Sequence, residues 1–229
     1  MKLNDILIEE ILKEGVYDRA IFKTIFMAGG PGSGKSYVLN KSTMGHGFKV
    51  VASDVPFERL IKKHGLSLKF PKDQLDKIMA LRPKAKKTAN AQHDAYIDGR
   101  LGFIVDGTGK NYSKIKSHVA DLKKLGYDCY MVFVNTSLEV ALERNQKRER
   151  SLPEDIVKQA WYDAQQNLGK FQSLFGRSNI SIIDNSTRDN SSGLDKLWKE
   201  VKKFAESSIT NPIAKKWITL QLKLRNRLK

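Results

Sequence analysis

Five short apolar runs alternate along this chain with longer segments of helical spacing. The runs are rich in branched and aromatic residues and almost continuously apolar, which is typical of strands covered on both faces. This alternation predicts a parallel sheet with helices on each side. We expect strands at residues 21–27, 49–52, 103–105, 129–134 and 180–183.

The segments between these runs place apolar residues three and four positions apart, as Leu75, Ile78 and Met79 do. That spacing predicts helices. Pro71 and Pro83 interrupt the first long segment, so we expect more than one helix there. The predicted fold is an α/β three-layer sandwich with a five-stranded parallel sheet. Its helices are expected at residues 73–98, 112–125, 138–149, 154–174 and 194–206.

Both ends of the chain read as additions to one domain at residues 16–208. Residues 1–15 have the spacing of a short amphipathic helix that packs on the domain or on a partner. Residues 209–229 form the C-terminal addition, in which Asn211-Pro212 breaks the chain and residues 213–229 then predict a basic amphipathic helix with an apolar stripe that must be buried. Docking on the domain with a solvated basic face, contact with nucleic acid and contact with a membrane surface all remain open for it. The stripe comprises Ile213, Trp217, Leu220, Leu224 and Leu228.

Composition narrows the class of protein. The 229 residues suffice for one packed domain, with 40% hydrophobic and 29% charged residues. No apolar run approaches the roughly 18 residues of a membrane span, so we expect a soluble, cytoplasmic protein. A single cysteine, Cys129, excludes an internal disulfide and is expected to pack in a strand. The net charge of +16 favours a polyanionic partner, and nucleic acid is a candidate.

The strongest motif follows the first predicted strand. Residues 29–36 read GGPGSGKS, which satisfies G-x-x-x-x-G-K-[ST] at every fixed position and precedes a helical pattern. In such a loop the backbone N–H groups surround phosphates, the lysine reaches the β- and γ-phosphates, and the serine hydroxyl ligates Mg²⁺. We therefore expect ATP and Mg²⁺ as cofactors. The expected nucleotide-binding residues are Gly30, Pro31, Gly32, Ser33, Gly34, Lys35, Ser36 and Tyr37.

Polar residues follow the other predicted strands too. Asp54 comes just after the second strand, and Asp106 and Thr108 follow the third. Ligands of open parallel sheets bind outside the carboxyl ends of the strands, so these side chains are candidates for contact with a metal or substrate. The histidines His93 and His118 fall on helical patterns without metal-ligand spacing or partners, and we assign them no chemistry.

From about residue 21 to residue 186 the chain resembles the phosphate-loop kinases grouped with zeta toxins and the kinase domain of polynucleotide kinase. The resemblance rests on GGPGSGKS, on SDVPFERLI after the second strand, on FIVDGTG at the third, and on LERNQKRERSLPEDIVKQAW. It implies a phosphotransferase in which Asp54 accepts the proton of the substrate hydroxyl and Asp106 helps to hold Mg²⁺ or substrate. Thr108 would lie beside that substrate.

The resemblance also implies an arginine lid over the phosphates, around residues 144–153. Arg144 and Arg148 are spaced i and i+4 on a predicted helix, so both could face the nucleotide, with Arg150 near the substrate. Arg59 stands where the family has an arginine after its base. Structural alternatives remain: a solvated helix end for the arginines, a helix N-cap for Asp54 and a turn for Asp106.

A kinase therefore leads the competing classes. Neither an Asn-Lys-x-Asp guanine signature nor an Asp-Glu hydrolytic pair is present, which argues against a switch or motor. The expected acceptor bears a hydroxyl group, such as the 5′-hydroxyl of a polynucleotide. The alternatives are a nucleotide sugar or other small molecule, or an ATPase that binds nucleic acid without being a kinase.

Overall fold

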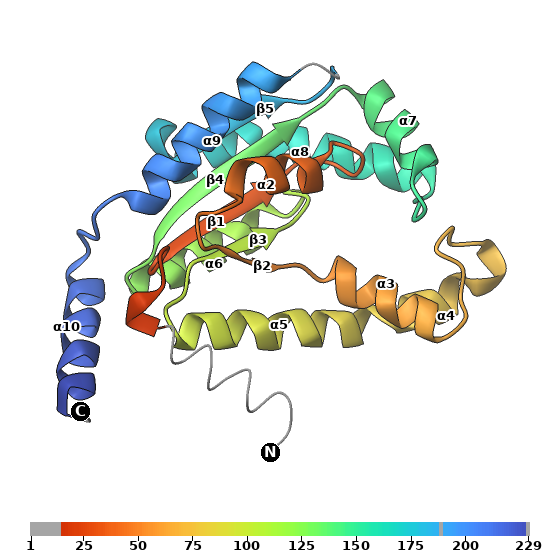
Figure 1. Ribbon diagram of the computed structural model, residues 1–229. Coiled ribbons are helices and arrows are strands. Elements are labelled where there is room, and N and C mark those ends of the chain that lie inside the picture. The colour runs from red at the N-terminus through yellow and green to blue at the C-terminus, as the bar shows by residue number, and fades with distance from the viewer. Residues whose placement is uncertain (1–14, 188–189, 228–229) are drawn as a thin grey trace.

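One parallel sheet forms the centre of the protein. The computed structural model describes residues 15–187 and 190–227. Its strands lie in the order β2-β3-β1-β4-β5 (Figure 1). Each of the five expected strands is present, with bounds within two residues of those predicted. They are β1 (Lys23–Ala28), β2 (Lys49–Val51), β3 (Phe103–Asp106), β4 (Asp128–Asn135) and β5 (Ile180–Asp184).

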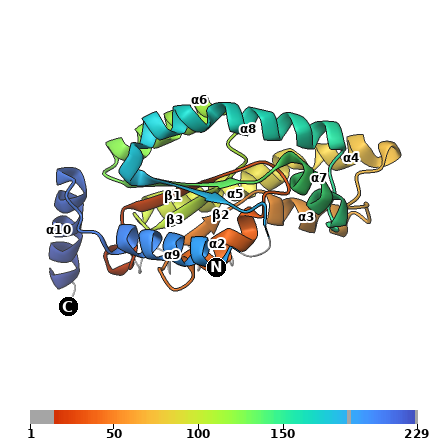
Figure 2. The same ribbon diagram turned by 90° about the horizontal axis from the view of Figure 1, so that it is seen from above.

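Alternation along the strands divides the core into two layers. On β4, Met131 and Phe133 belong to one buried cluster, whereas Val132 and Val134 belong to the other. Successive strand residues point to opposite faces, so an all-apolar strand requires helices on both. Figure 2 shows both layers, and the predicted fold class is confirmed. The first cluster is covered by α5 (Arg82–Asp98), α6 (Tyr112–Lys124) and α8 (Glu154–Phe175), and the second by α2 (Lys35–Thr43) and α9 (Ser191–Glu206).

A third apolar cluster lies beyond the carboxyl edge of the sheet. It joins Phe57 and Ile61 of α3 (Asp54–Lys63) to Ile78 of α4 (Leu75–Ala80) and to Ala85 of α5. The long segment before β3 is indeed more than one helix. Its second break falls at Leu81, since Pro83 lies in the first turn of α5, where its missing N–H costs nothing. The helix α3 was not among those predicted, because its apolar face is short and Pro56 lies inside it.

The remaining elements connect this framework. A 3₁₀ turn, η1 (Gly15–Tyr17), precedes β1, and η2 (Lys72–Gln74) precedes α4. The helix α7 (Leu138–Lys147) follows β4, and η3 (Arg177–Asn179) precedes β5. The expected N-terminal helix at residues 1–15 falls outside the described residues, apart from Gly15 in η1. None of the helices in the described parts of the chain is long and apolar enough to cross a membrane.

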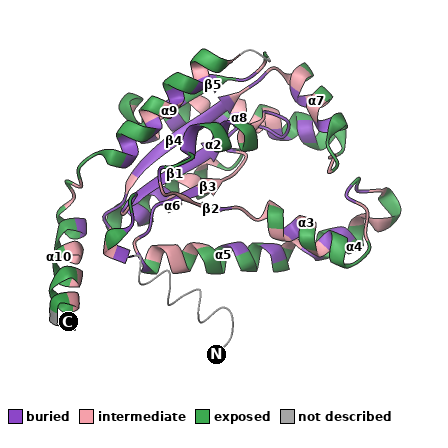
Figure 3. Ribbon diagram, in the orientation of Figure 1, coloured by how far each residue is buried: buried purple, intermediate pink, exposed green. Residues whose placement is uncertain are grey.

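The C-terminal helix, α10 (Pro212–Arg227), packs beside the amino-terminal ends of the strands. Trp217 contacts Phe22, just before β1, in an edge-to-face arrangement with ring centroids 5.5 Å apart. Ala214 is fully buried against Gly126, which lies just before β4. The prediction that the whole stripe is buried is wrong: Ile213, Leu220 and Leu224 are exposed (Figure 3). Of the predicted stripe, Trp217 does pack on the body, together with Ala214, which was not part of the stripe, and Leu228 lies outside the described residues.

The cysteine expectation holds. Cys129 is buried in β4, and burial raises the pKa of its thiol to about 12. A thiol that stays protonated is a poor nucleophile, so this cysteine acts as a packing residue.

The close approach of α10 to Gly126 yields a stability prediction. Gly126 has φ +102°, and a Cβ there would stand 3.0 Å from the Ala214 nitrogen. We expect Gly126→Ala to lower the free energy of unfolding through backbone strain and crowding. Gly65→Ala, at φ +66° with open space around it, provides a control for strain alone. In urea titrations the first variant should lose at least about 1 kcal/mol more than the second. Equal losses would show that α10 does not press on this turn.

Candidate active site

The phosphate loop, residues 29–36, packs closely against neighbouring elements. A Cβ at Gly32 would lie 2.1 Å from the carbonyl oxygen of Ala141 in α7, and one at Gly34 would lie 2.3 Å from Nδ2 of Asn185 after β5. Both glycines have positive φ, +80° and +84°. Glycine is therefore required at both positions, because the backbone has a positive φ and because a side chain would clash with the neighbouring atoms.

Lys35 bends back over this loop. Its Nζ donates to the carbonyl oxygens of Gly29 at 2.8 Å and Gly30 at 3.1 Å. The side chain is half-buried, and burial lowers its pKa while the nearby charges of Asp106 and Asp54 act in the opposite direction. Two carboxylates from different strand ends thus converge on the lysine that the motif identified.

Asp106 lies at the end of β3, which pairs directly with β1. Its Oδ1 is buried with no hydrogen-bond partner, and burial raises the pKa of this carboxyl group. An unsatisfied buried carboxylate oxygen is costly without a ligand. The unpartnered Asp106 oxygen fits a site in which Asp106 and the exposed Ser36 hydroxyl would together hold a hard cation. Mg²⁺ suits such a site because it takes oxygen ligands from few protein groups.

Asp54 is the first residue of α3 and lies between two arginines. Arg150 Nη2 donates to its Oδ2 at 2.8 Å, and Arg82 Nη1 lies 3.4 Å from its Oδ1. Burial acts to raise the pKa of Asp54, but the charges of Arg150, Arg82 and Lys35 and the Arg150 hydrogen bond together hold it below its usual value. Asp54 is not the N-cap, a position that Ser53 occupies.

Arg150 joins the loop after α7 to α3. Its side chain is 9% exposed, and its Nε also lies 3.1 Å from Oε1 of Glu58. Arg82, at the start of α5, stacks its guanidinium 4.6 Å from the ring centroid of Phe57. Sequence reasoning missed Arg82 and Glu58. The spacing of Glu58, one turn after Asp54, was a usable signal, whereas Arg82 is distant in sequence.

The other expected arginines occupy different surroundings. Arg144 Nη1 donates to the carbonyl oxygen of Asn185 at 2.7 Å, next to the phosphate loop. The helix α7 ends at Lys147, so Arg148 follows it with extended backbone, and the two arginines do not share a helix face as expected. Arg148 still acts electrostatically on Lys35 and Asp106. Arg59 is exposed on α3, and Arg82 and Arg150 are the arginines that contact Asp54.

The remaining predicted residues line the edges of the loop. The main-chain oxygen of Thr108 accepts from the Gly29 N–H at 3.1 Å, and Tyr37 is exposed one turn into α2. Two further residues, to which the sequence gave no such role, hold the loop. Asn185 donates to the Ser33 oxygen at 2.8 Å, and Trp161 packs on Gly30 while its Nε1 donates to the Thr136 oxygen.

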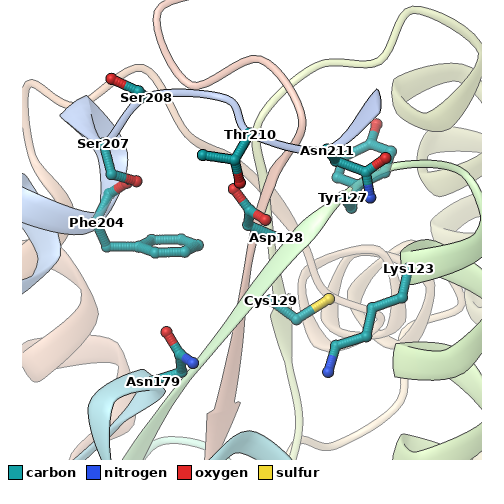
Figure 4. Close-up of a pocket in the computed structure, with 10 residues that line it drawn as sticks. All are labelled: Lys123, Tyr127, Asp128, Cys129, Asn179, Phe204, Ser207, Ser208, Thr210 and Asn211. Atoms are coloured by element: carbon teal, nitrogen blue, oxygen red, sulfur yellow. The ribbon is translucent and has the colours of Figure 1, made fainter. Parts of the chain in front are cut away.

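Two features lie away from this site. The expectation that the histidines lack partners is wrong, since the Nε2 atoms of His93 and His118 are 2.6 Å apart. A cavity at the amino-terminal edge of the sheet is lined by Lys123, Asp128 and Thr210 among others and contains none of the predicted site residues (Figure 4).

Comparison with known proteins agrees with this geometry. The family model described as zeta toxin matches residues 12–192. The chain belongs to the zeta toxin family. A curated cytidylate kinase of Sulfurisphaera tokodaii is 27% identical over 192 residues, which cover 83% of this chain and 97% of that protein. This chain is therefore a P-loop kinase, that is, a phosphotransferase that uses a nucleotide.

Solved structures show the same fold. The crystal structure of AvrRxo1-ORF1:-ORF2 with ATP is similar at a TM-score of 0.58 with 13% identity, covering 90% of this chain and 73% of that one. A structure of the PezAT toxin-antitoxin system of Streptococcus pneumoniae is similar at a TM-score of 0.50 with 15% identity, covering 96% of both chains. At such identities the likeness shows the architecture alone.

The ion pair of Arg150 with Asp54 should depend on pH. We expect Arg150→Gln to be less stable than the wild type at neutral pH, because the ionised Asp54 carboxylate loses its partner. A depressed pKa contributes stability above the ordinary carboxyl value of 3.8 that is lost as the pH falls through the folded-state pKa. The difference in unfolding free energy should therefore shrink in acid. Arg59→Gln, an exposed site on α3, should show no such trend. A pH-independent difference would contradict the prediction.

Proposed function

We propose that this kinase transfers the γ-phosphate of ATP to a hydroxyl group that Asp54 orients. The observation that carries this proposal is the convergence of Asp54, Lys35 and Asp106, from three different strand ends, within electrostatic reach of one another. The phosphate loop would hold the nucleotide phosphates on one side of this convergence. Asp54 is half-exposed on the other side, where an acceptor could enter.

Phosphoryl transfer to a hydroxyl group needs only a weak base. The acceptor oxygen forms a bond to the γ-phosphorus, the bond from that phosphorus to the β–γ bridging oxygen breaks, and ADP leaves. Because the transition state is loose, the hydroxyl proton leaves late and can pass to a weak base. Asp54, kept ionised by its arginines, accepts a hydrogen bond from the hydroxyl, aligns its lone pair, and then takes the proton.

Cationic side chains would neutralise the charge that spreads over the transferred group. Lys35 would exchange its carbonyl partners for phosphate oxygens, and Arg144 and Arg148 border the same space. Mg²⁺ bound through Ser36 and Asp106 would supply further charge compensation at the phosphates. Glu58 pairs with Arg150 through Nε while Asp54 pairs with it through Nη2, so Arg150 would keep a carboxylate partner when an acceptor binds at Asp54.

We further propose that the acceptor is a nucleotide that carries both a hydroxyl and a phosphate. Residues 54–87 contain ten lysines and arginines against four acids, so the acceptor side of the site is strongly cationic. Arg82, stacked on Phe57, keeps donors available for a phosphate beside the hydroxyl. A phosphate as the nucleophile is disfavoured by the carboxylates of Asp54 and Glu58. The 5′-hydroxyl end of a polynucleotide and a nucleotide sugar both have the proposed chemistry.

The basic helix α10 does not contribute to this acceptor site. It packs at the amino-terminal edge of the sheet, whereas the phosphate loop follows the carboxyl end of β1. A strand of six residues separates the two by about 20 Å. The charge that could attract an acceptor therefore comes from α3, α4 and the start of α5.

Asp54→Asn tests the role of the carboxylate. The amide cannot take the proton, so kcat should fall by about 100-fold while the KM for ATP changes little. Steady-state kinetics with each accepted hydroxyl substrate would measure this, with Asp73→Asn on η2 as the control. Normal turnover combined with a lower melting temperature would reduce Asp54 to a helix-start residue.

Arg82→Gln tests the acceptor class. A panel would contain a 5′-hydroxyl oligonucleotide, a uridine-diphosphate sugar, cytidine monophosphate and an unphosphorylated nucleoside. We expect the KM for the accepted nucleotide to rise about tenfold or more, since a charged hydrogen bond to phosphate is lost. The KM for the nucleoside should not change. Lys84→Gln, at an exposed position in the same first turn of α5, is the control. An equal effect on the nucleoside would exclude phosphate recognition by Arg82.

A further inference from the structure

The helix α10 stands at one end of the molecule, apart from the layers that sandwich the sheet (Figures 1 and 2). Only one side of it faces the body, through Ala214 against Gly126 and Trp217 against Phe22. Arg225 places its guanidinium 5.1 Å from the ring centroid of Tyr17 in η1, which fixes the distal part of the helix. The body thus contacts the sector of the helix around Ala214, and the rest of the helix surface faces away from these contacts.

A stripe of large aliphatic residues runs along the helix beside Trp217, at the border of the packed side. Ile213, Leu220 and Leu224 are 52%, 53% and 45% exposed. They are spaced seven and four residues apart, so they lie along one line of the helix. Within the described parts of the chain, no element packs over this line. Aliphatic residues at helical spacing are expected to be buried, so this stripe is a candidate binding surface for a partner.

Lysines border the stripe on its solvent side. Lys216 is four residues before Leu220, and Lys223 is three residues after it, so both are neighbours of the stripe on the helix surface. Residues 212–227 contain no acid at all. The surface thus combines aliphatic side chains with a row of flexible cations whose stems can lie along an apolar layer.

We propose that α10 docks this face, defined by Ile213, Lys216, Leu220, Lys223 and Leu224, onto an anionic lipid surface. The aliphatic line would enter the boundary between headgroups and acyl chains while the lysines meet the negative headgroups. Nucleic acid explains only half of the surface, because phosphates offer nothing to an aliphatic stripe. A second copy of the same helix would bring lysine rows together, which like-charge repulsion disfavours.

The experiment uses the full chain and sedimentation with vesicles of phosphatidylcholine, either alone or mixed in equal parts with phosphatidylglycerol. The wild type should bind the mixed vesicles and release them at high salt, since screening weakens the lysine contribution. Leu220→Asp should reduce the partition coefficient by roughly tenfold or more, as one large apolar side chain is lost from the interface and a negative charge is added.

Leu222→Asp is the matched control. Leu222 is 38% exposed on the same helix, and its substitution adds the same negative charge. It is two positions from both Leu220 and Leu224, so helical rotation of about 200° puts it on a different side of the helix from the stripe. It should change vesicle binding by no more than about twofold. Because both leucines are exposed, neither substitution should alter the melting temperature, which checks that folding is intact.

Several outcomes would overturn the proposal. One is an absence of vesicle binding by the wild type, and another is an equal loss in the two variants, which would report charge alone. Binding to a single-stranded oligonucleotide without binding to vesicles would assign the helix to nucleic acid. A dimer that Leu220→Asp dissociates, in the absence of lipid, would assign it to a second copy.

Discussion

The fit of the phosphate loop between α7 and Asn185 is the constraint on which the site depends. Backbone N–H groups can surround phosphates only if the loop keeps its curl without a ligand, and two glycines with positive φ allow neighbouring atoms to approach closely enough to hold it. Asn185 bonds the loop from β5 and Arg144 bonds Asn185 from α7. The loop and the helix α7, which leads to Arg148 and Arg150, therefore form one unit.

The charged groups around Lys35 connect this unit with the proposed acceptor side of the site. Lys35 lies between two carboxylates, Asp106 and Asp54, whose surroundings differ: burial raises the pKa of Asp106, whereas arginines depress that of Asp54. The first is a carboxylate that gains from a cation, and the second is one that stays ionised without it. Two acids near one lysine can thus have different tasks, one at the metal and one at the acceptor.

Positive charge is concentrated in two distant parts of this protein. The segment from α3 to the start of α5 is cationic beside the site, and α10 is cationic at the opposite edge of the sheet. A single polyanion does not account for both without wrapping around the molecule. The two proposed partners, an anionic acceptor at one end and an anionic surface at the other, would account for the high net charge without such wrapping.

The sequence by itself predicted the five strands, the phosphate loop and the carboxylates Asp54 and Asp106, because each follows from local chemistry: apolar runs, glycine spacing and acids placed just after strands. It did not identify Arg82 as a neighbour of the site, since Arg82 is distant from Asp54 in sequence and belongs to no motif. It gave Asn185, which directly follows a strand, and Trp161, which ends the last segment of the resemblance, no role in holding the loop, because those contacts depend on the tertiary structure. It also predicted burial of the whole apolar stripe of α10, of which Trp217 packs on the body while Ile213, Leu220 and Leu224 are exposed. Periodicity shows that a helix has an apolar stripe, but only the tertiary structure decided that small Ala214 could approach Gly126 closely and turn Leu220 and Leu224 towards solvent, because burial depends on which surfaces fit together.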